Sequence, residues 1–122
     1  VAQLNGGFLL QKDGSNFLKI GRGTGTATYF SQSNVAGANQ YLSNYEPSPT
    51  LGAAQKVATR FSTNNFRTAY NGILTAADTS GNVPTNMTTL GLNGIVGFHL
   101  YRKIDLYPTA YTDTQLQALT SP

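Results

Sequence analysis

The stretch RTAYNGILTA, residues 67–76, decides the fold of this chain. Two short runs, 67–70 and 73–76, flank the dipeptide Asn71-Gly72. Asparagine and glycine accept the positive φ angles of a type I′ turn, which joins two antiparallel strands through two residues. The stretch therefore predicts a β-hairpin, around which the rest of the chain has to fold.

A second hairpin is predicted near the amino terminus. Asp13-Gly14 lies between Phe8–Lys12 and Asn16–Ile20, and this dipeptide also tolerates the φ angles of a tight hairpin. A helical apolar period almost nowhere lasts for several turns, whereas short apolar runs separated by turn residues are frequent. The pattern as a whole indicates an all-β protein.

Further strands are predicted at Gln55–Ser62 and Thr88–Leu92, with a turn-rich connection over Asp78–Met87. We also expect a strand within Gly21–Tyr29, after a glycine corner. Ser31–Gly52 is rich in Ser, Asn, Gly and Pro. We interpret it as a long loop or an interrupted edge, because its prolines oppose a central strand.

The longest β-like run is Ile95–Tyr107. Strict alternation along it would turn Arg102 toward the core, which is energetically costly. We therefore predict a β-bulge near Arg102-Lys103, which would let both cations reach water. The apolar residues that the bulge would leave in the core are Tyr101, Ile104 and Leu106.

A helix is predicted only at the carboxy terminus. Thr112-Asp113-Thr114-Gln115 is a capping box, in which the Thr112 hydroxyl and the Gln115 amide can satisfy free backbone N–H groups at the start of a helix. Leu116 and Leu119 follow at helical spacing. We expect this short helix to pack on the sheets.

The composition excludes several classes of function. Charged residues make up 11% of the chain, well below the roughly 25% of an average domain, so the surface is rich in hydroxyl and amide groups. The net charge of +3 comes from cations scattered between Lys12 and Lys103, which does not fit the clustered stripe of a nucleic-acid-binding protein. No apolar run approaches the length that crosses a bilayer. We expect neither nucleic acid nor membrane insertion, and the chain has no cysteine for disulfide or thiolate chemistry.

Several motifs follow one another in the second half of the chain. They are Phe66–Gly72, Asp78–Thr85, Leu92–Gly94, Tyr107-Pro108 and Gln115–Thr120. In this order they resemble the carboxy-terminal part of a concanavalin A-like lectin/glucanase (LamG-like) domain, in the form found in virion proteins of tailed bacteriophages. The resemblance implies an antiparallel jelly-roll β-sandwich with one short C-terminal helix, and a component of a virus particle. Residues before about Lys56 match only as a general strand pattern.

We expect one such domain over residues 1–122. Jelly rolls of this family usually have more residues, and the chain starts at Val1 rather than at a methionine. Both observations are consistent with its being the carboxy-terminal part of a longer chain.

The acidic residues do not indicate an enzyme. They are Asp13, Glu46, Asp78, Asp105 and Asp113. Glycoside hydrolysis requires two carboxylates across a groove, but no two of these acids are close enough in sequence to share a strand face, and the Glu-x-Asp-x-x-Glu pattern of the glucanase relatives is absent. Asp78 is predicted to stabilise a turn rather than to bind calcium, and the single histidine, His99, lacks the spacing of a metal or catalytic site. We expect no catalytic residue, no metal and no cofactor.

The best candidate for ligand binding lies in the segment Asn39–Tyr45. Tyr41 and Tyr45 could stack on sugar rings, while Asn39 and Asn44 could bind the sugar hydroxyls. In the alternative interpretation, the two tyrosines simply pack the loop or contact a neighbouring subunit.

Two functional hypotheses follow. The first is a non-enzymatic structural protein of a bacteriophage virion, a head decoration or a component of the tail or fibre, whose partners are other virion proteins and copies of itself. The second is a carbohydrate-binding module that recognises glycans on the host surface. A glycosidase is disfavoured by the acids described above.

Overall fold

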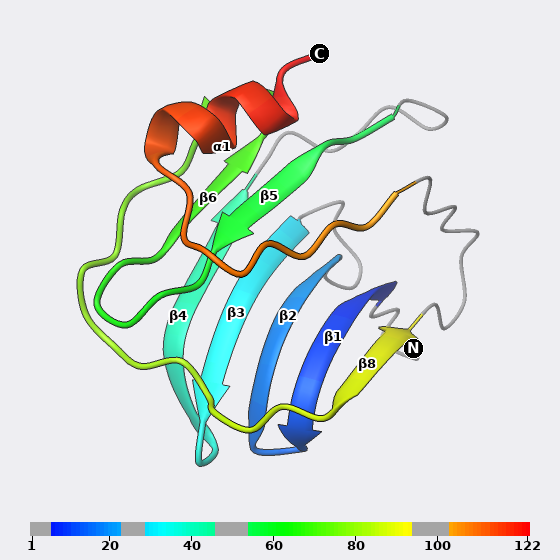
Figure 1. The fold of residues 1–122 in the computed structure, drawn as a ribbon, viewed down its shortest axis with the longest axis vertical. Helices are drawn as coiled ribbons and strands as arrows, with labels where there is room; N and C mark the ends of the chain where they lie inside the picture. Colours follow the sequence, from blue (N-terminus) through cyan, green and yellow to red (C-terminus); the bar gives the residue numbers. More distant parts are fainter. Residues whose placement is uncertain (1–5, 23–28, 46–53, 94–102) are drawn as a thin grey trace.

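The computed structural model of the chain describes residues 6–22, 29–45, 54–93 and 103–122. These residues form two antiparallel sheets and one short helix (Figure 1). The larger sheet has five strands in the order β4-β3-β2-β1-β8, and the smaller has three in the order β5-β6-β7. The predicted mostly-β architecture with a C-terminal helix is confirmed.

The strands of the larger sheet are β1 (Gly6–Asp13), β2 (Asn16–Arg22), β3 (Tyr29–Val35), β4 (Ala38–Tyr45) and β8 (Thr89–Asn93). Those of the smaller sheet are β5 (Val57–Arg60), β6 (Arg67–Tyr70) and β7 (Ile73–Leu74). Helix α1 spans Asp113–Thr120. Strands β1 to β4 are successive antiparallel neighbours, and β8 returns to pair with β1.

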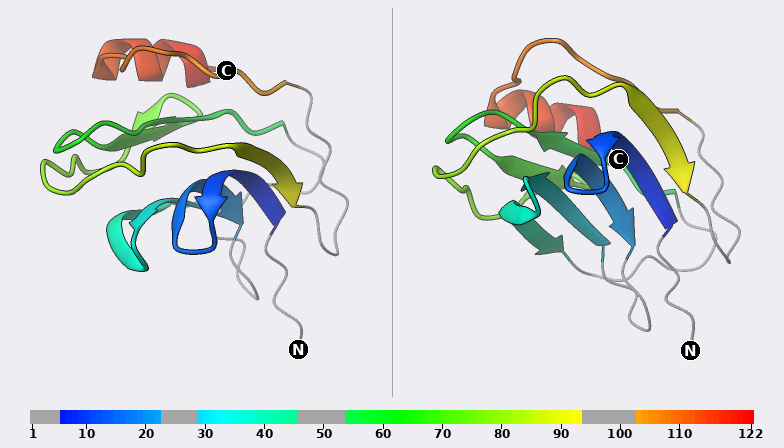
Figure 2. Two further views of the ribbon diagram at one scale, coloured as in Figure 1. Left: turned by 60° about the horizontal axis from the view of Figure 1, so that its bottom comes forward. Right: turned by 90° about the horizontal axis from the view of Figure 1, so that it is seen from below.

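The elements lie in three layers, with the small sheet between α1 and the large sheet (Figure 2). Residues of β6 and just before it alternate between its two faces. Phe66 stacks on Tyr41 of β4, with ring centroids 5.1 Å apart, whereas Ala69 faces α1 and is fully buried. A small side chain at this position lets the helix approach closely, and Leu116 of α1 is buried in the contact. The small sheet is therefore covered on both faces.

The hairpin predicted at Asn71-Gly72 is confirmed. Asn71 and Gly72 have φ angles of 45° and 81°, and Tyr70 pairs directly with Ile73. Both turn residues have positive φ, as a type I′ turn requires. Strand β7 is shorter than predicted and ends at Leu74, although the Thr75 N–H still donates to the Thr68 carbonyl at 2.9 Å.

The first hairpin is also confirmed, but its turn is built differently. Asp13 pairs with Asn16, so the loop residues are Gly14 and Ser15, and neither has a left-handed φ. A carboxylate oxygen of Asp13 instead accepts hydrogen bonds from the Ser15 N–H at 2.9 Å and from Asn16 Nδ2 at 3.0 Å. Asp13 therefore shapes this turn through its side chain.

Of the two alternatives for Ser31–Gly52, the long loop is wrong as far as Tyr45, whereas an edge is formed there, because β4 is an edge strand of the large sheet. Strands β3 and β4 form a hairpin here, joined by Ala36 and Gly37 with φ angles of 51° and 82°. Alanine rarely adopts a positive φ, so the sequence contains no ordinary signal for this turn. Residues 23–28 of the strand expected within Gly21–Tyr29 lie outside the described residues, while Gly21 belongs to β2 and Tyr29 begins β3.

The strand prediction for Ile95–Tyr107 is wrong in its described part. Residues 103–107 form no strand, and Ile104 and Leu106 are exposed rather than in the core. Residues 94–102, and with them Tyr101 and the expected bulge at Arg102, lie outside the described residues. The strands predicted at Gln55–Ser62 and Thr88–Leu92 are confirmed as β5 and β8.

The capping box of α1 is confirmed. The Thr112 hydroxyl accepts a hydrogen bond from the Gln115 N–H, and Gln115 Oε1 accepts one from the Thr112 N–H at 2.8 Å. Of the two leucines at helical spacing, Leu116 is buried and Leu119 remains partly exposed. The helix thus packs on the small sheet through a narrow face.

Candidate functional site

Two arginines lie opposite each other on the small sheet, beneath the start of α1. Arg60 ends β5, Arg67 begins β6, and the two pair directly in the ladder. Their neighbours Thr59 and Thr68 point to the large sheet, so alternation turns both arginines toward the helix. Like charges directly opposite each other destabilise a sheet, and this pair therefore requires a counter-ion.

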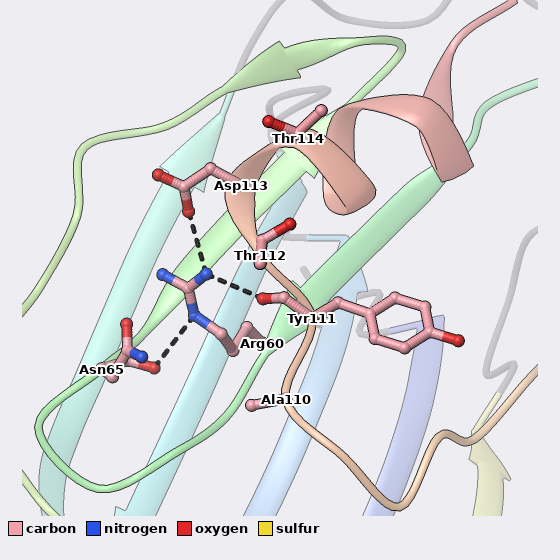
Figure 3. Close-up of a pocket in the computed structure, with 7 residues that line it drawn as sticks. All are labelled: Arg60, Asn65, Ala110, Tyr111, Thr112, Asp113 and Thr114. Atoms are coloured by element: carbon pink, nitrogen blue, oxygen red, sulfur yellow. Dashed lines mark hydrogen bonds and ion pairs between the residues drawn. The ribbon is translucent and has the colours of Figure 1, made fainter.

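Asp113, the first residue of α1, supplies the counter-ion. Its Oδ1 lies 2.9 Å from a terminal nitrogen of Arg60, and its Oδ2 lies 2.8 Å from one of Arg67. The same nitrogen of Arg60 donates to the Tyr111 carbonyl at 2.8 Å, and Nε donates to the Asn65 carbonyl (Figure 3). A carboxylate in the first helical turn also interacts favourably with the helix dipole.

These residues line an open depression of about 450 Å³. Its lining residues are Arg60, Asn65, Ala110, Tyr111, Thr112, Asp113 and Thr114 (Figure 3). Both oxygens of Asp113 accept hydrogen bonds from arginine, and the Thr112 hydroxyl caps the helix. Asp113 is the one carboxylate among these lining residues. The depression therefore lacks the second carboxylate that glycoside hydrolysis requires. The cluster fastens α1 to the small sheet.

The structure does not bring the four predicted sugar-binding residues together. Tyr41 and Tyr45 are only 4% exposed and point between the sheets, whereas Asn39 and Asn44 are exposed. The physical reason is that this segment is the strand β4, in which Tyr41 and Tyr45 share one face and Asn44 lies on the other. Stacking on a sugar requires an open ring face, and the two tyrosines have none. Their alternative role, packing within the protein, fits this placement.

Tyr45 lies among other aromatic rings. Its ring stacks on Tyr70 at 5.1 Å and lies 6.0 Å from Tyr29, centroid to centroid. Burial raises the pKa of the Tyr45 hydroxyl well above its ordinary range, and the neighbouring Ser31 offsets only part of this effect. Within the described residues, the hydroxyl makes no hydrogen bond of ordinary geometry.

A chain of hydroxyl groups crosses between the two sheets. Ser31 Oγ lies 2.7 Å from Thr59 Oγ1, which lies 3.0 Å from Thr68 Oγ1, and the Tyr41 hydroxyl is also 3.0 Å from Thr68 Oγ1. Ser31 and Thr68 are fully buried. Because a buried hydroxyl needs a partner, these bonds fix how the sheets sit on each other. No local pattern in the sequence marks this network, since Ser and Thr are abundant throughout the chain.

The other described acids hold local structure. Asp78 Oδ1 accepts hydrogen bonds from the N–H and the hydroxyl of Ser80, both at 2.9 Å, which confirms the predicted turn. Asp105 pairs with Lys103 at 2.9 Å and raises the pKa of that lysine. In the part of the chain that is described, no three His, Cys, Asp or Glu residues come together to hold a metal. Residues Glu46 and His99 lie outside that part.

Strand β8 leaves apolar side chains in contact with solvent. Leu90 and Leu92 are 53% and 54% exposed. In the ladder they pair with Leu10 and Phe8 of β1, and this row lies on the face of the large sheet that carries Tyr41 in β4. The small sheet lies over β3 and β4 (Figure 1). The β8 end of the same face therefore remains partly open, and we call Leu90 and Leu92 the β8 leucines.

The outward face of the large sheet carries a different set of groups. The ammonium of Lys19 lies 5.3 Å from the ring centroid of Phe30, and partial burial lowers the pKa of this lysine. Asn44 pairs with Phe30 in the ladder and is exposed on this face. The outward face thus combines an aromatic ring, a cation and an amide.

Comparison with models of protein families, with curated proteins and with solved structures found no match. Within the described residues, no helix has the length and the apolar character needed to cross a membrane.

Proposed function

We propose that the chain is a non-enzymatic structural protein of a bacteriophage virion, a head decoration or a tail or fibre component, built on a concanavalin A-like jelly roll. The phage assignment and the jelly-roll connection rest on the motifs of residues 66–120. Two stacked antiparallel sheets with a C-terminal helix are compatible with them. The structural roles of Asp13, Asp78, Asp105 and Asp113 support a function without catalysis.

The observation that carries the proposal is the half-exposed pair of β8 leucines. They lie on an edge strand, beside the apolar residues Phe8 and Leu10 of β1. Exposed apolar groups on a sheet edge are typical of surfaces that pair with another protein. With 11% charged residues, the chain would associate through apolar, hydroxyl and amide contacts rather than through ion pairs. In the proposed particle, this surface contacts a copy of the chain or another virion protein.

Sedimentation of the full chain and its co-purification with assembled particles test the proposal. The test variants are Leu90→Ser and Leu92→Ser, and the matched control is Ile73→Ser, because Ile73 is 52% exposed on β7 of the other sheet. We expect both test variants to fold. Their association constants should fall by roughly fivefold to thirtyfold, since removing an apolar side chain from an interface costs on the order of 1–2 kcal/mol. The control should associate like the unaltered chain.

Two results would contradict the proposal. One is a chain that stays monomeric and never associates with particles. The other is association that both β8 variants leave unchanged, which would show that the β8 leucines face solvent in the working protein. Urea unfolding of each variant separates loss of association from loss of folding.

The second candidate function is a carbohydrate-binding module for host-surface glycans, and the outward face of the large sheet favours it. Phe30 and Asn44 are neighbours there, and an aromatic ring beside an amide suits a sugar. In this form of the hypothesis Asn44 keeps its predicted role, while Tyr41 and Tyr45 support the sheet from within.

Glycan-array binding distinguishes the two candidates. If the outward face binds a sugar, Asn44→Ala should abolish the signal, while Asn82→Ala, at an exposed loop residue, should preserve it. Tyr41→Phe should also preserve it, because the Tyr41 hydroxyl faces Thr68 in the core. Absence of glycan binding by the unaltered chain would remove this candidate.

A further inference from the structure

The Asn71-Gly72 turn contains the dipeptide that is chemically most prone to spontaneous deamidation. Glycine has no side chain to hinder its own backbone nitrogen, so the Gly72 nitrogen can attack Cγ of Asn71. A bond from that nitrogen to Cγ forms, the bond from Cγ to Nδ2 breaks, and ammonia leaves with the proton lost by the Gly72 amide. Water then opens the cyclic imide at either carbonyl, which yields aspartate or isoaspartate.

The structure holds the Asn71 side chain at both of its polar atoms. Oδ1 accepts a hydrogen bond from the Lys56 N–H at 3.0 Å, and Nδ2 donates one to Gln55 Oε1 at 2.5 Å. The backbone N–H of Asn71 donates in turn to the Lys56 carbonyl at 2.9 Å. The carboxamide is therefore tied to the chain just before β5, and attack by Gly72 would require these bonds to break.

Helix α1 holds the attacking nitrogen. The Gly72 N–H donates to Thr120 Oγ1 at 3.1 Å, and the Gly72 carbonyl accepts from Gln117 Nε2 at 3.2 Å. Thr120 is 1% exposed, and its hydroxyl donates to the Leu116 carbonyl at 3.0 Å. The proton that has to leave Gly72 is thus engaged in a partly buried hydrogen bond with the last residue of the helix.

We propose that Asn71-Gly72 is a latent deamidation site that the docking of α1 keeps unreactive. Release of the helix frees the Gly72 nitrogen, and the reaction then makes the release permanent. Isoaspartate adds a methylene group to the backbone of a two-residue turn, and either product replaces the Nδ2 donor to Gln55 with an acceptor. This inference is independent of the function proposed above.

The experiment follows deamidation of the full chain at mildly alkaline pH, by mass spectrometry and by enzymatic labelling of isoaspartate. The reference for an unprotected site is a synthetic peptide of residues 67–76. Because a site that reacts only after local opening is slowed by the opening equilibrium, we expect Asn71 in the folded chain to react at least about tenfold more slowly than in the peptide.

Thr120→Val tests the role of the helix, since valine keeps the shape of threonine and removes the acceptor for Gly72. The matched control is Thr114→Val, the same change at an exposed position of α1. We expect Thr120→Val to accelerate deamidation toward the peptide rate and to increase hydrogen exchange at the Gly72 amide, while Thr114→Val changes neither.

Two outcomes overturn the proposal. One is deamidation of Asn71 in the unaltered chain at the peptide rate, with peptide mapping separating it from the other Asn-Gly dipeptides at 5–6 and 93–94. The other is a deamidation rate that rises equally in Thr120→Val and Thr114→Val, or that rises in neither variant. If Thr120→Val unfolds the whole chain, which circular dichroism would detect, Gln117→Ala replaces it. That side chain is exposed and donates a hydrogen bond to the Gly72 carbonyl.

Discussion

Replacing Asp113 with asparagine should loosen α1 from the small sheet. The change keeps the size and shape of the side chain but removes the charge that holds Arg60 and Arg67. An amide retains one acceptor oxygen for one guanidinium and turns N–H donors toward the other. The two arginines, which are opposite each other in the ladder, then repel each other without a counter-ion.

The size of the expected loss in the free energy of unfolding depends on how deeply the charged side chains are buried. The Arg60 side chain is 9% exposed and that of Asp113 is 40% exposed. Breaking a fully buried pair costs about 3–5 kcal/mol, whereas an exposed pair contributes only about 0–1 kcal/mol. Because one partner is buried and the other half-exposed, we expect Asp113→Asn to lower the free energy of unfolding by about 2 kcal/mol.

Urea unfolding and thermal unfolding measure this change. For a chain of this size, about 2 kcal/mol corresponds to a decrease in Tm of roughly 8 °C. The matched control is Asp105→Asn, because Asp105 pairs with Lys103, whose side chain is 77% exposed. We expect this second variant to unfold at nearly the same urea concentration and temperature as the unaltered chain, because an exposed pair contributes little to stability.

Equal stabilities of the two variants would refute the reasoning. That result would mean that solvent satisfies Arg60 and Arg67 as well as Asp113 does. Hydrogen exchange provides an independent check, since the loss in Asp113→Asn should be concentrated in the amides of α1.

Three further predictions test other parts of the fold. Gly72→Ala should lower the free energy of unfolding by about 1 kcal/mol, because Gly72 has φ +81°. Gly14→Ala should be neutral or slightly stabilising, since Gly14 has no left-handed φ and no atoms near an added Cβ. Equal losses of stability in urea unfolding would contradict this account of the two turns. Tyr41→Phe should lower stability by about 1 kcal/mol, because it removes the hydroxyl bonded to Thr68, and an unchanged unfolding midpoint would mean that this bond contributes nothing. Hydrogen bonds from the Asn16 side chain and the Ser15 backbone lower the pKa of Asp13 below its ordinary value of 3.8. The contribution of Asp13 to stability is therefore present above pH 3.8 and is lost as the pH falls through the lowered pKa. An NMR titration that places the midpoint of Asp13 at or above 3.8 would disprove this.

Local chemistry predicted the elements whose signals lie within a few residues. Asn71-Gly72 forms its turn because both residues accept positive φ, and Thr112 and Gln115 cap α1 because each bonds the backbone of the other. Asp78 holds its turn through atoms only two residues away. None of these features depends on how the sheets pack.

The hairpin of β3 and β4 could not be predicted in the same way. Its turn uses Ala36 at φ 51°, a conformation that alanine does not favour by itself. Contacts from the neighbouring hairpin support it, since Asn16 Oδ1 accepts from the Ala36 N–H and the Ser15 carbonyl accepts from the Gly37 N–H. These contacts exist only after β2 and β3 have paired.

The chain's own order of residues determined that this would be a β protein with a neutral, hydroxyl-rich surface and one capped helix, because turn preferences, caps and composition act locally. Tertiary structure alone decided which side chains are buried and which charged side chains contact one another. Tyr41 and Tyr45 are in the core because β4 pairs and alternates. Arg60, Arg67 and Asp113 meet because ladder register and helix docking bring together residues that are far apart in the chain, and no local propensity encodes such an encounter.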